Sequence, residues 1–555
     1  MLNRHFNILV YIVIGVSCFF LGTIIQSGGG NPITRDIIAS AEKIIGLEFT
    51  DVKRDSMIDG LGDQLKNYQH IRDVNLRNDI PPAFLFNPIP AGFKFETKRL
   101  KFKTSPVKHV VLPKNIEDVA FYSIGQLAEL IRTRKITSVQ LTQMYIDRIK
   151  KYNPMLKAVI TITEDLAMQE AKLADEEIAK GKYRGLLHGI PYGAKDLLSV
   201  KGYKSTWGSV PYKDQMIAED ATVIKKLREA GAVLIAKTTL GELANGDVWF
   251  GGMTRNPWDT SKGSSGSSAG TASGTAAGLY AFGIGSETWG SIVSPSTVCG
   301  TTGLRPTFGR VSRKGAMALS WTMDKLGPIC RNVEDCAIVF NAIYGKDPSD
   351  PATYDAPFNY TPNIDLKELK IGYLKNDFDS VKDNKEMNEA VFSVLKIMGI
   401  ELLPIELPKY PTNDLAIILT AEAGAAFDDL TRSGKDSLMV LQSKDAWPNI
   451  FRTARFIPAV EYIQASRIRY LIIQDMQTLM KKIDIYLAPA FQGDNLLLTN
   501  LTGHPCVVLP TGFTKEGLPT SITFMGKLFG EGELLAFAKK YQDATDFHLK
   551  HPGLK

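Results

Sequence analysis

Apolar and polar positions switch between helical and strand periods from about residue 120 onward, and this predicts helices and strands in alternation. Leu127, Leu130 and Ile131 share one face of a predicted helix, and a capping box at Thr137 begins a second. The further predicted elements are strands at Lys157–Thr163, Ile190–Lys195 and Val233–Ala236 and helices at Asp165–Lys180, Asp220–Ala230 and Ala421–Phe427. Strands that alternate with helices predict an α/β fold with helices on both faces of a sheet.

The N-terminus carries a long apolar run, Phe6–Ile25, behind the positive charge of Arg4. A helix of this length, at about 1.5 Å per residue, spans roughly 30 Å, the hydrocarbon thickness of a bilayer. The run predicts a membrane anchor, or a signal peptide cut near Ser27–Gly30; a buried helix is the alternative. We therefore expect an exported or membrane-anchored protein with its body on the non-cytoplasmic side, periplasmic if the source is bacterial.

Three segments follow from this pattern. Residues 1–30 form the signal peptide or anchor, and residues 31–118, whose pattern is mixed, form an extension that packs on the core. Residues 119–550 form one large domain, because no long linker interrupts them.

Composition narrows the classes of function. With 44% hydrophobic and 22% charged residues over 555 positions, the chain is neither largely disordered nor a multi-span membrane protein. A net charge of +6 without a basic stripe argues against nucleic-acid binding. The five cysteines lack zinc-type spacing and the seven histidines form no metal motif, so we expect no metal and no other cofactor.

A segment of small residues, Gly263–Gly274, stands out from the rest of the chain. Glycine recurs in and after it at every fourth position: Gly266, Gly270, Gly274 and Gly278. On a helix these positions form one stripe against which a neighbour can pack closely, a period that a flexible linker does not need. The apolar run Leu279–Ile284 and a second small-residue loop, Gly285–Ser291, come next.

Five blocks of sequence, in order, resemble the amidase signature family. They are Gly189–Asp196, Gly266–Gly270, Gly285–Ile292, Cys299–Thr307, and Asn500–Pro505 with Gly517–Pro519. The resemblance covers roughly residues 120–550. It implies that family's fold, a single large domain with a mixed twisted sheet, and makes residues 119–550 an amidase domain.

The resemblance also implies a reaction: hydrolysis of a carboxylic amide C–N bond through an acyl-serine intermediate, by a Ser–Ser–Lys triad. Carried over, the nucleophile is Ser291, the bridging serine after a cis peptide bond is Ser267, and the base is Lys195. Ser264 and Ser265 are the other candidates for the bridge.

The chemistry of these residues supports such a site. A serine hydroxyl needs a base, and a lysine serves only when neutral, so its pKa must fall well below about 10.4. Lys195 follows an uncharged run, and Asp196 points to the opposite face of the strand. We expect the backbone N–H groups of Thr288, Trp289 and Gly290 to form the oxyanion hole.

Two departures from the family bear on the substrate. Trp289 stands where members usually carry glycine, so the indole is expected to narrow the pocket. Members that act on substrates with a free carboxylate often have an arginine shortly after the nucleophile, where this chain has Ile292-Val293-Ser294. A small anionic substrate such as glutamine is therefore disfavoured, and a small-molecule amide is the expected partner.

Three alternatives stay open at this point. The chain could be the glutaminase (A) subunit of a glutamyl-tRNA amidotransferase, which Val293 and Phe6–Ile25 disfavour. It could be a hydrolase of the fatty-acid-amide type, whose membrane association through residues 6–25 would help apolar substrates. It could also be a catalytically inactive binding protein, and a homodimer is compatible with any of them.

Other residues have simpler expected roles. Arg305 is expected to be structural and Cys299 to be a small core residue rather than a nucleophile. Trp447, Phe451 and Phe456 either line an apolar cleft or belong to the core.

Overall fold

The computed structural model describes residues 32–74, 76–107, 109–381 and 385–554. The chain divides into two compact units, Met1–Arg77 and Asn78–Lys555. The described part of the smaller unit holds α2 (Arg35–Ile45) and α3 (Asp51–Arg72), which ion pairs join. The predicted boundaries at residues 30 and 118 stay predictions.

The apolar run Phe6–Ile25, predicted to be a signal peptide or anchor, lies outside the described residues. Among the helices of the described part of the chain, none combines the length and the apolar composition needed to cross a membrane.

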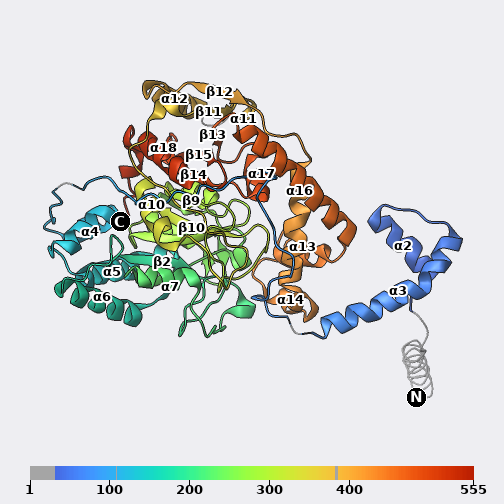
Figure 1. The fold of residues 1–555 in the computed structure, drawn as a ribbon. Coiled ribbons are helices and arrows are strands. Elements are labelled where there is room, and N and C mark those ends of the chain that lie inside the picture. Colours follow the sequence, from blue (N-terminus) through green and yellow to red (C-terminus); the bar gives the residue numbers. More distant parts are fainter. Residues whose placement is uncertain (1–31, 75, 108, 382–384, 555) are drawn as a thin grey trace, which may run out of the picture. The chain divides into compact units, whose positions relative to one another are not determined.

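The larger unit is built on one mixed sheet, for which the described residues supply eleven strands in the order β1-β3-β2-β8-β10-β9-β14-β15-β13-β11-β12 (Figure 1). These strands are β1 (Val159–Ile162), β2 (Pro191–Lys195), β3 (Val233–Thr238), β8 (Phe282–Glu287), β9 (Thr302–Arg305), β10 (Lys325–Cys330), β11 (Ile371–Leu374), β12 (Leu402–Ile405), β13 (Ile485–Pro489), β14 (Cys506–Phe513) and β15 (Pro519–Gly526). Two small ribbons pair β4 (Val248–Trp249) with β5 (Gly252–Met253) and β6 (Arg255–Asn256) with β7 (Asp259–Gly263).

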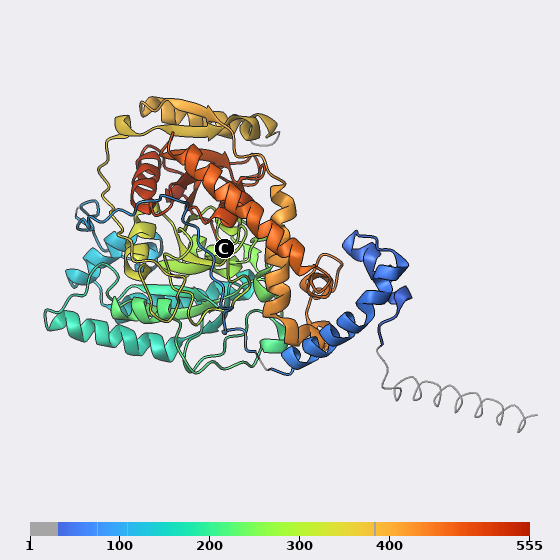
Figure 2. The ribbon, with the colours of Figure 1, turned by 45° about the vertical axis from the view of Figure 1, so that its right-hand side comes forward.

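Helices cover both faces of this sheet, as the sequence predicts. They are α4 (Ile124–Arg132), α5 (Ser138–Leu156), α6 (Glu164–Ala179), α7 (Thr222–Glu229), α8 (Ala269–Ala276), α9 (Val293–Cys299), α10 (Val333–Ile343), α11 (Lys375–Ser380), α12 (Lys385–Ile397), α13 (Ile417–Ala426), α14 (Asp428–Arg432), α15 (Trp447–Ala454), α16 (Ala459–Met480), α17 (Asn495–Thr502) and α18 (Glu531–Asp543). On β14, Val507 and Leu509 belong to the same apolar cluster as the buried residues of α18. Cys506 and Val508 belong to a second cluster, with those of α16 and α17. Figure 1 places α18 and α17 on opposite sides of β14 and β15, and Figure 2 shows the long α16 beside α13.

Most of the predicted elements are present, with shifted ends. The capping box of Thr137 with Gln140 begins α5, and the three predicted strands are β1, β2 and β3. Asp220 does not cap α7, whose N-cap is Ala221; its carboxylate instead pairs with Arg228 and accepts from a backbone N–H.

Of the four glycines predicted to share one helical face, Gly270 and Gly274 lie in α8, whereas Gly266 precedes that helix and Gly278 follows it. A Cβ on Gly270 would lie 2.0 Å from the carbonyl oxygen of Ala158, and one on Gly266 would lie 1.8 Å from that of Gly246. No side chain fits at either position, so the segment is tightly packed and is not a flexible linker.

Two features of the sheet position the candidate site. β2 and β8 are neighbouring parallel strands, with Ala194 opposite Ile284. Their carboxyl ends therefore meet at one edge, which brings Lys195, the last residue of β2, close to the loop that follows Glu287. The segment before α8 carries Ser267 to the same place, because that residue hydrogen-bonds Lys195.

Candidate active site

Lys195 lies at the centre of a cluster of hydroxyl groups. Its Nζ is 2.7 Å from Ser267 Oγ, 2.8 Å from Ser286 Oγ and 3.1 Å from Ser268 Oγ. These serines come from the segment before α8 and from β8, so two separate stretches of sequence converge on the amine that β2 carries.

Burial sets the charge of this lysine. Lys195 is completely buried, and burial lowers its pKa well below the usual value, against a smaller opposing effect of the Asp324 and Glu287 carboxyls. Asp196 does not hold it charged, because the Asp196 carboxylate pairs with Lys237 at 2.6 Å. The amine of Lys195 is therefore available as a base near neutral pH.

Ser267 is the one of the three candidate bridging serines that contacts this amine. The Gly266–Ser267 peptide bond is cis, as the family resemblance implies. The Ser264 hydroxyl instead donates to the Ser265 carbonyl, and the Ser265 N–H donates to Asp247.

Ser291 lies in the loop between β8 and α9 and is partly exposed. The Ser268 N–H donates to the Ser291 carbonyl oxygen at 3.2 Å, so this loop is in direct contact with the segment of Ser267. The hydroxyls of Ser267 and Ser291, both in the described part of the chain, are not hydrogen-bonded to each other.

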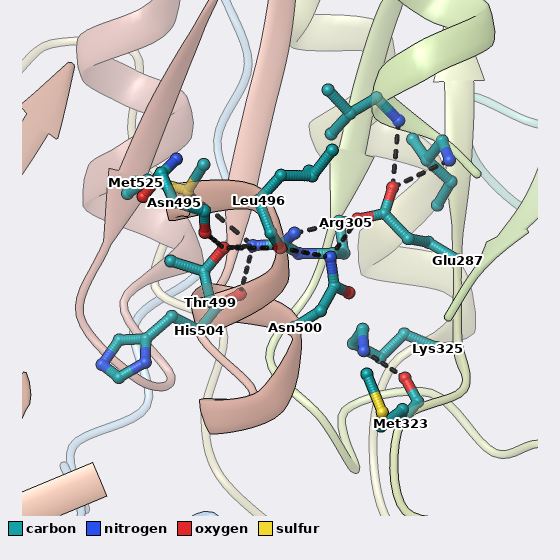
Figure 3. Close-up of polar contacts among 12 residues, drawn as sticks. Glu287, Arg305, Met323, Lys325, Asn495, Leu496, Thr499, Asn500, His504 and Met525 are labelled. Carbon is teal, nitrogen blue, oxygen red and sulfur yellow. Dashed lines mark hydrogen bonds and ion pairs between the residues drawn. The ribbon is translucent and has the colours of Figure 1, made fainter. Parts of the chain in front are cut away.

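A buried carboxylate holds one end of this loop (Figure 3). Glu287 Oε2 accepts from the N–H groups of Ile292 and Val293 at 2.8 and 3.0 Å, and Oε1 accepts from Arg305 and Asn500, both at 2.8 Å. Burial opposes ionisation of Glu287, but the Arg305 guanidinium, together with the hydrogen bonds from Asn500 and the Val293 N–H, leaves its pKa below the usual value. The ionised carboxylate thus fixes the backbone that directly follows Ser291.

Arg305 ties this carboxylate to the C-terminal part of the chain. Its guanidinium also donates to Thr499 Oγ1 at 2.9 Å and to the His504 carbonyl oxygen at 3.0 Å, and its side chain is fully buried. The Asn500–Pro505 block therefore supports the loop that holds Ser291 through Arg305 and Glu287. These contacts agree with the structural role expected for Arg305.

A second carboxylate, that of the partly buried Asp324, holds the other end of the loop. The Thr288 hydroxyl donates to Asp324 Oδ1 at 2.5 Å, and Oδ2 accepts from the N–H groups of Leu319 and Ser320 at 2.8 and 3.0 Å. Burial raises the pKa of Asp324, and these donors act against it. The loop from Thr288 to Val293 is consequently anchored on both sides of Ser291.

The predicted oxyanion donors lie between these anchors. The backbone N–H groups of Thr288, Trp289 and Gly290 donate to no other residue in the described ranges, and Gly290 adopts a φ of 90°. Glycine suits this left-handed conformation, which side chains rarely adopt. The loop can therefore offer unpaired N–H groups beside the Ser291 hydroxyl.

Several site residues were not predicted from the sequence. Glu287 lies inside the Gly285–Ile292 block. An acidic residue at the end of an apolar strand was the signal in the sequence that could have identified it. Asn500 also lies in such a block, Asn500–Pro505, but nothing there points to its partner Glu287, which is 213 positions away. Asp324 lies in none of the blocks, and its partner Thr288 is 36 positions away. Ser268 and Ser286 adjoin recognised positions, but their contacts with Lys195 depend on the fold.

The remaining candidates are core or surface residues. Cys299 is buried, and burial raises the pKa of its thiol, so it is a core residue and no nucleophile. Trp447 and Phe451 stack on each other inside the core, with ring centroids 5.1 Å apart. Phe456 is 64% exposed.

Comparisons with known proteins agree with this geometry. A family model described as Amidase matches residues 140–497. The A subunit of the glutamyl-tRNA(Gln) amidotransferase from Thermoanaerobacter pseudethanolicus is 34% identical over 478 residues, 77% of this chain and 97% of the relative. Its counterpart from Coxiella burnetii is 33% identical over 483 residues, which cover 78% of this chain and 99% of that relative. The native peptide amidase of Stenotrophomonas maltophilia, a solved structure, superposes with a TM-score of 0.69 at 29% identity, covering 77% of this chain and 98% of that one.

These relatives contradict the predicted location. They are subunits of an amidotransferase named for a tRNA. The prediction of an exported or membrane-anchored body was therefore wrong. It depended on the hydropathy of Phe6–Ile25 alone, which says nothing about the rest of the chain.

Proposed function

Because the chain belongs to the amidase family, it is an enzyme that hydrolyses amide C–N bonds, and we propose that Ser291, Ser267 and Lys195 perform this reaction. Ser291 is the nucleophile, Ser267 relays its proton and Lys195 is the base. The observation that carries the proposal is the fully buried Lys195 amine, 2.7 Å from the Ser267 hydroxyl.

A count of donors and acceptors supports the direction of the relay. A neutral lysine amine has two N–H donors and one lone pair. The Ser268 hydroxyl donates to the Ser286 carbonyl oxygen, so its oxygen can only accept from Lys195. If the second N–H points to Ser286 Oγ, the lone pair is left for the Ser267 hydroxyl. This arrangement prepares Ser267 to pass a proton to the amine.

The cycle follows from these roles. Ser291 Oγ attacks the amide carbonyl carbon, while its proton passes to Ser267 Oγ and the Ser267 proton passes to Lys195 Nζ. The carbonyl oxygen becomes an oxyanion that the N–H groups of Thr288–Gly290 bind. The C–N bond breaks as the relay returns a proton to the leaving amine. Water then attacks the acyl-serine through the same relay and releases the acid.

A second candidate function comes from the relatives. The glutamyl-tRNA(Gln) amidotransferase subunits match this chain over nearly their whole length, which favours an ammonia-releasing role in a larger complex. Against it, Val293 is fully buried in an apolar cluster with Met323 and Leu497, at the place where an arginine would meet a substrate carboxylate. We therefore favour hydrolysis of an uncharged amide by this chain itself.

A fluorophosphonate probe tests the proposal. Its phosphorus forms a bond to the nucleophilic serine oxygen as fluoride leaves. We expect the wild-type chain to be labelled at Ser291 and Ser291→Ala to be unlabelled. Ser294→Ala, which removes a partly buried hydroxyl three residues away, is the matched control and should label normally. Labelling that survives Ser291→Ala would overturn the assignment.

A further inference from the structure

Trp289 is an exposed aromatic residue in the middle of an otherwise fixed loop. Its side chain is 42% exposed, although it follows the buried Thr288 and lies two residues before Ser291. Within the described residues, no hydrogen bond, ring stacking or cation contact engages the indole. An indole left partly in water beside a nucleophile contributes little to the fold, so its surface is available to a ligand.

The surroundings of this indole are apolar. Leu496 lies against the same loop: a Cβ on Gly290 would be 3.0 Å from its Cδ2. Val293, just beyond the nucleophile, belongs to the apolar cluster of α16 and α17. An acyl or amine group bound beside Ser291 would therefore contact carbon atoms.

The basic side chains that interact electrostatically with this region already have partners. Arg305 binds Glu287, and Arg469 donates to Leu501 and Thr322. Arg313, which acts on Asp324, donates to the Trp321 carbonyl oxygen and pairs with Asp350. Lys325 donates to the Met323 carbonyl oxygen (Figure 3). Arg305, Arg469, Lys325 and Lys195 are buried, and Arg313 is engaged by Asp350, so a substrate carboxylate would find no unpaired cation among them.

From this arrangement we propose that Trp289 is a specificity-determining residue, which selects uncharged amides that carry an aromatic group beside the scissile bond. The inference rests on the proposed function, because it needs Ser291 as the nucleophile. A flat ring stacks on the exposed indole with its carbonyl oxygen toward the loop N–H groups. Stacking of two rings is worth about 2- to 12-fold in rate beyond simple burial. A free carboxylate, as in glutamine, loses its hydration and gains no partner.

The rate of Ser291 modification by fluorophosphonates measures this preference without a known substrate. Three probes differ only in the group on phosphorus: 2-phenylethyl, ethyl and 2-carboxyethyl. In the wild-type chain we expect the phenylethyl probe to react about 2- to 12-fold faster than the ethyl probe, and the carboxyethyl probe to be slowest. Trp289→Ala should bring the phenylethyl-to-ethyl ratio close to one, whereas Trp289→Phe should keep most of it.

A matched control separates a local effect from a general one. Phe456→Ala removes another exposed aromatic ring, 64% accessible, and should leave all three rates unchanged. An unchanged probe ratio in Trp289→Ala, or a carboxyethyl probe that reacts fastest, would overturn the inference while leaving Ser291 as nucleophile. If no probe modifies Ser291 in the wild-type chain, the proposed function itself fails.

Discussion

The bond between Thr288 and Asp324 offers a sharp test of how the oxyanion loop is held. Thr288→Val keeps the size and branching of the side chain but removes the hydroxyl that donates to Asp324 Oδ1 at 2.5 Å. Asp324 keeps its two backbone donors, Leu319 and Ser320, so the 319–324 segment should stay in place. The change therefore frees one end of the loop and leaves the Glu287 end fixed.

The expected size of the effect follows from these contacts. A hydrogen bond to a charged acceptor contributes about 1.5–3 kcal/mol, which is the energy that keeps the loop end in place. Each properly placed oxyanion donor is worth about 10²–10³ in rate. Because the Glu287 anchor remains, we expect a partial loss of alignment, and a rate about 10–100 times lower than that of the wild-type chain.

The assay is the rate of phosphonylation of Ser291, since the phosphoryl oxygen of the probe occupies the place of the oxyanion. Thr288→Ser is the matched control, because it keeps the hydroxyl, and it should react within about threefold of the wild type. Thermal unfolding of both variants checks that the fold is intact. Equal rates for Thr288→Val and the wild type, or equal losses in both variants, would refute the proposed role of Asp324.

Three further outcomes follow from the site. Lys195→Ala should nearly abolish modification of Ser291, while Ser267→Ala should slow it severely but less, both measured with the same probe. The wild-type rate should fall as the pH drops through the Lys195 pKa, which burial lowers, because only the neutral amine accepts a proton; a rate that rises toward acid would contradict this. Glu287→Gln should lower the unfolding free energy by about 3–5 kcal/mol in a denaturant titration, because it leaves the buried Arg305 without its counter-ion; an unchanged midpoint would contradict this ion pair.

The sequence predicts the candidate reacting residues of the site better than the buried polar residues that hold them in place. Lys195, Ser267 and Ser291 each lie in a short block with its own pattern, and the alternation of elements places the lysine at the end of a buried strand. The parallel pairing of β2 with β8 then brings these blocks to one edge of the sheet. Local patterns suffice to identify Lys195, Ser267 and Ser291 because each of these residues lies in a block with a recognisable pattern of its own.

The hydrogen bonds that link Glu287, Arg305, Thr499 and Asn500 could not be predicted from local sequence patterns. The bond from Asn500 to Glu287 joins residues 213 positions apart, and that from Arg305 to Thr499 joins residues 194 apart. Nothing in the local sequence pairs such residues, since buried polar groups find partners wherever the fold brings them. Asp220 behaves in the same way, because the sequence places it at a helix start but its carboxylate pairs with Arg228 instead.

The arrangement of the nucleophile loop separates what the reaction requires from what the substrate requires. Glu287 and Asp324 hold the two ends of the loop by side chains and backbone that face inward, so the N–H groups between them do not depend on the side chain at position 289. The residue at that position can therefore change without moving the donors or Ser291. A side chain at this place can therefore affect the substrate without altering the groups that react, which is the role proposed for Trp289. Identity of about one third with amidotransferase subunits thus supports the reaction class, whereas the preference among amides is the property that the exposed indole is proposed to select.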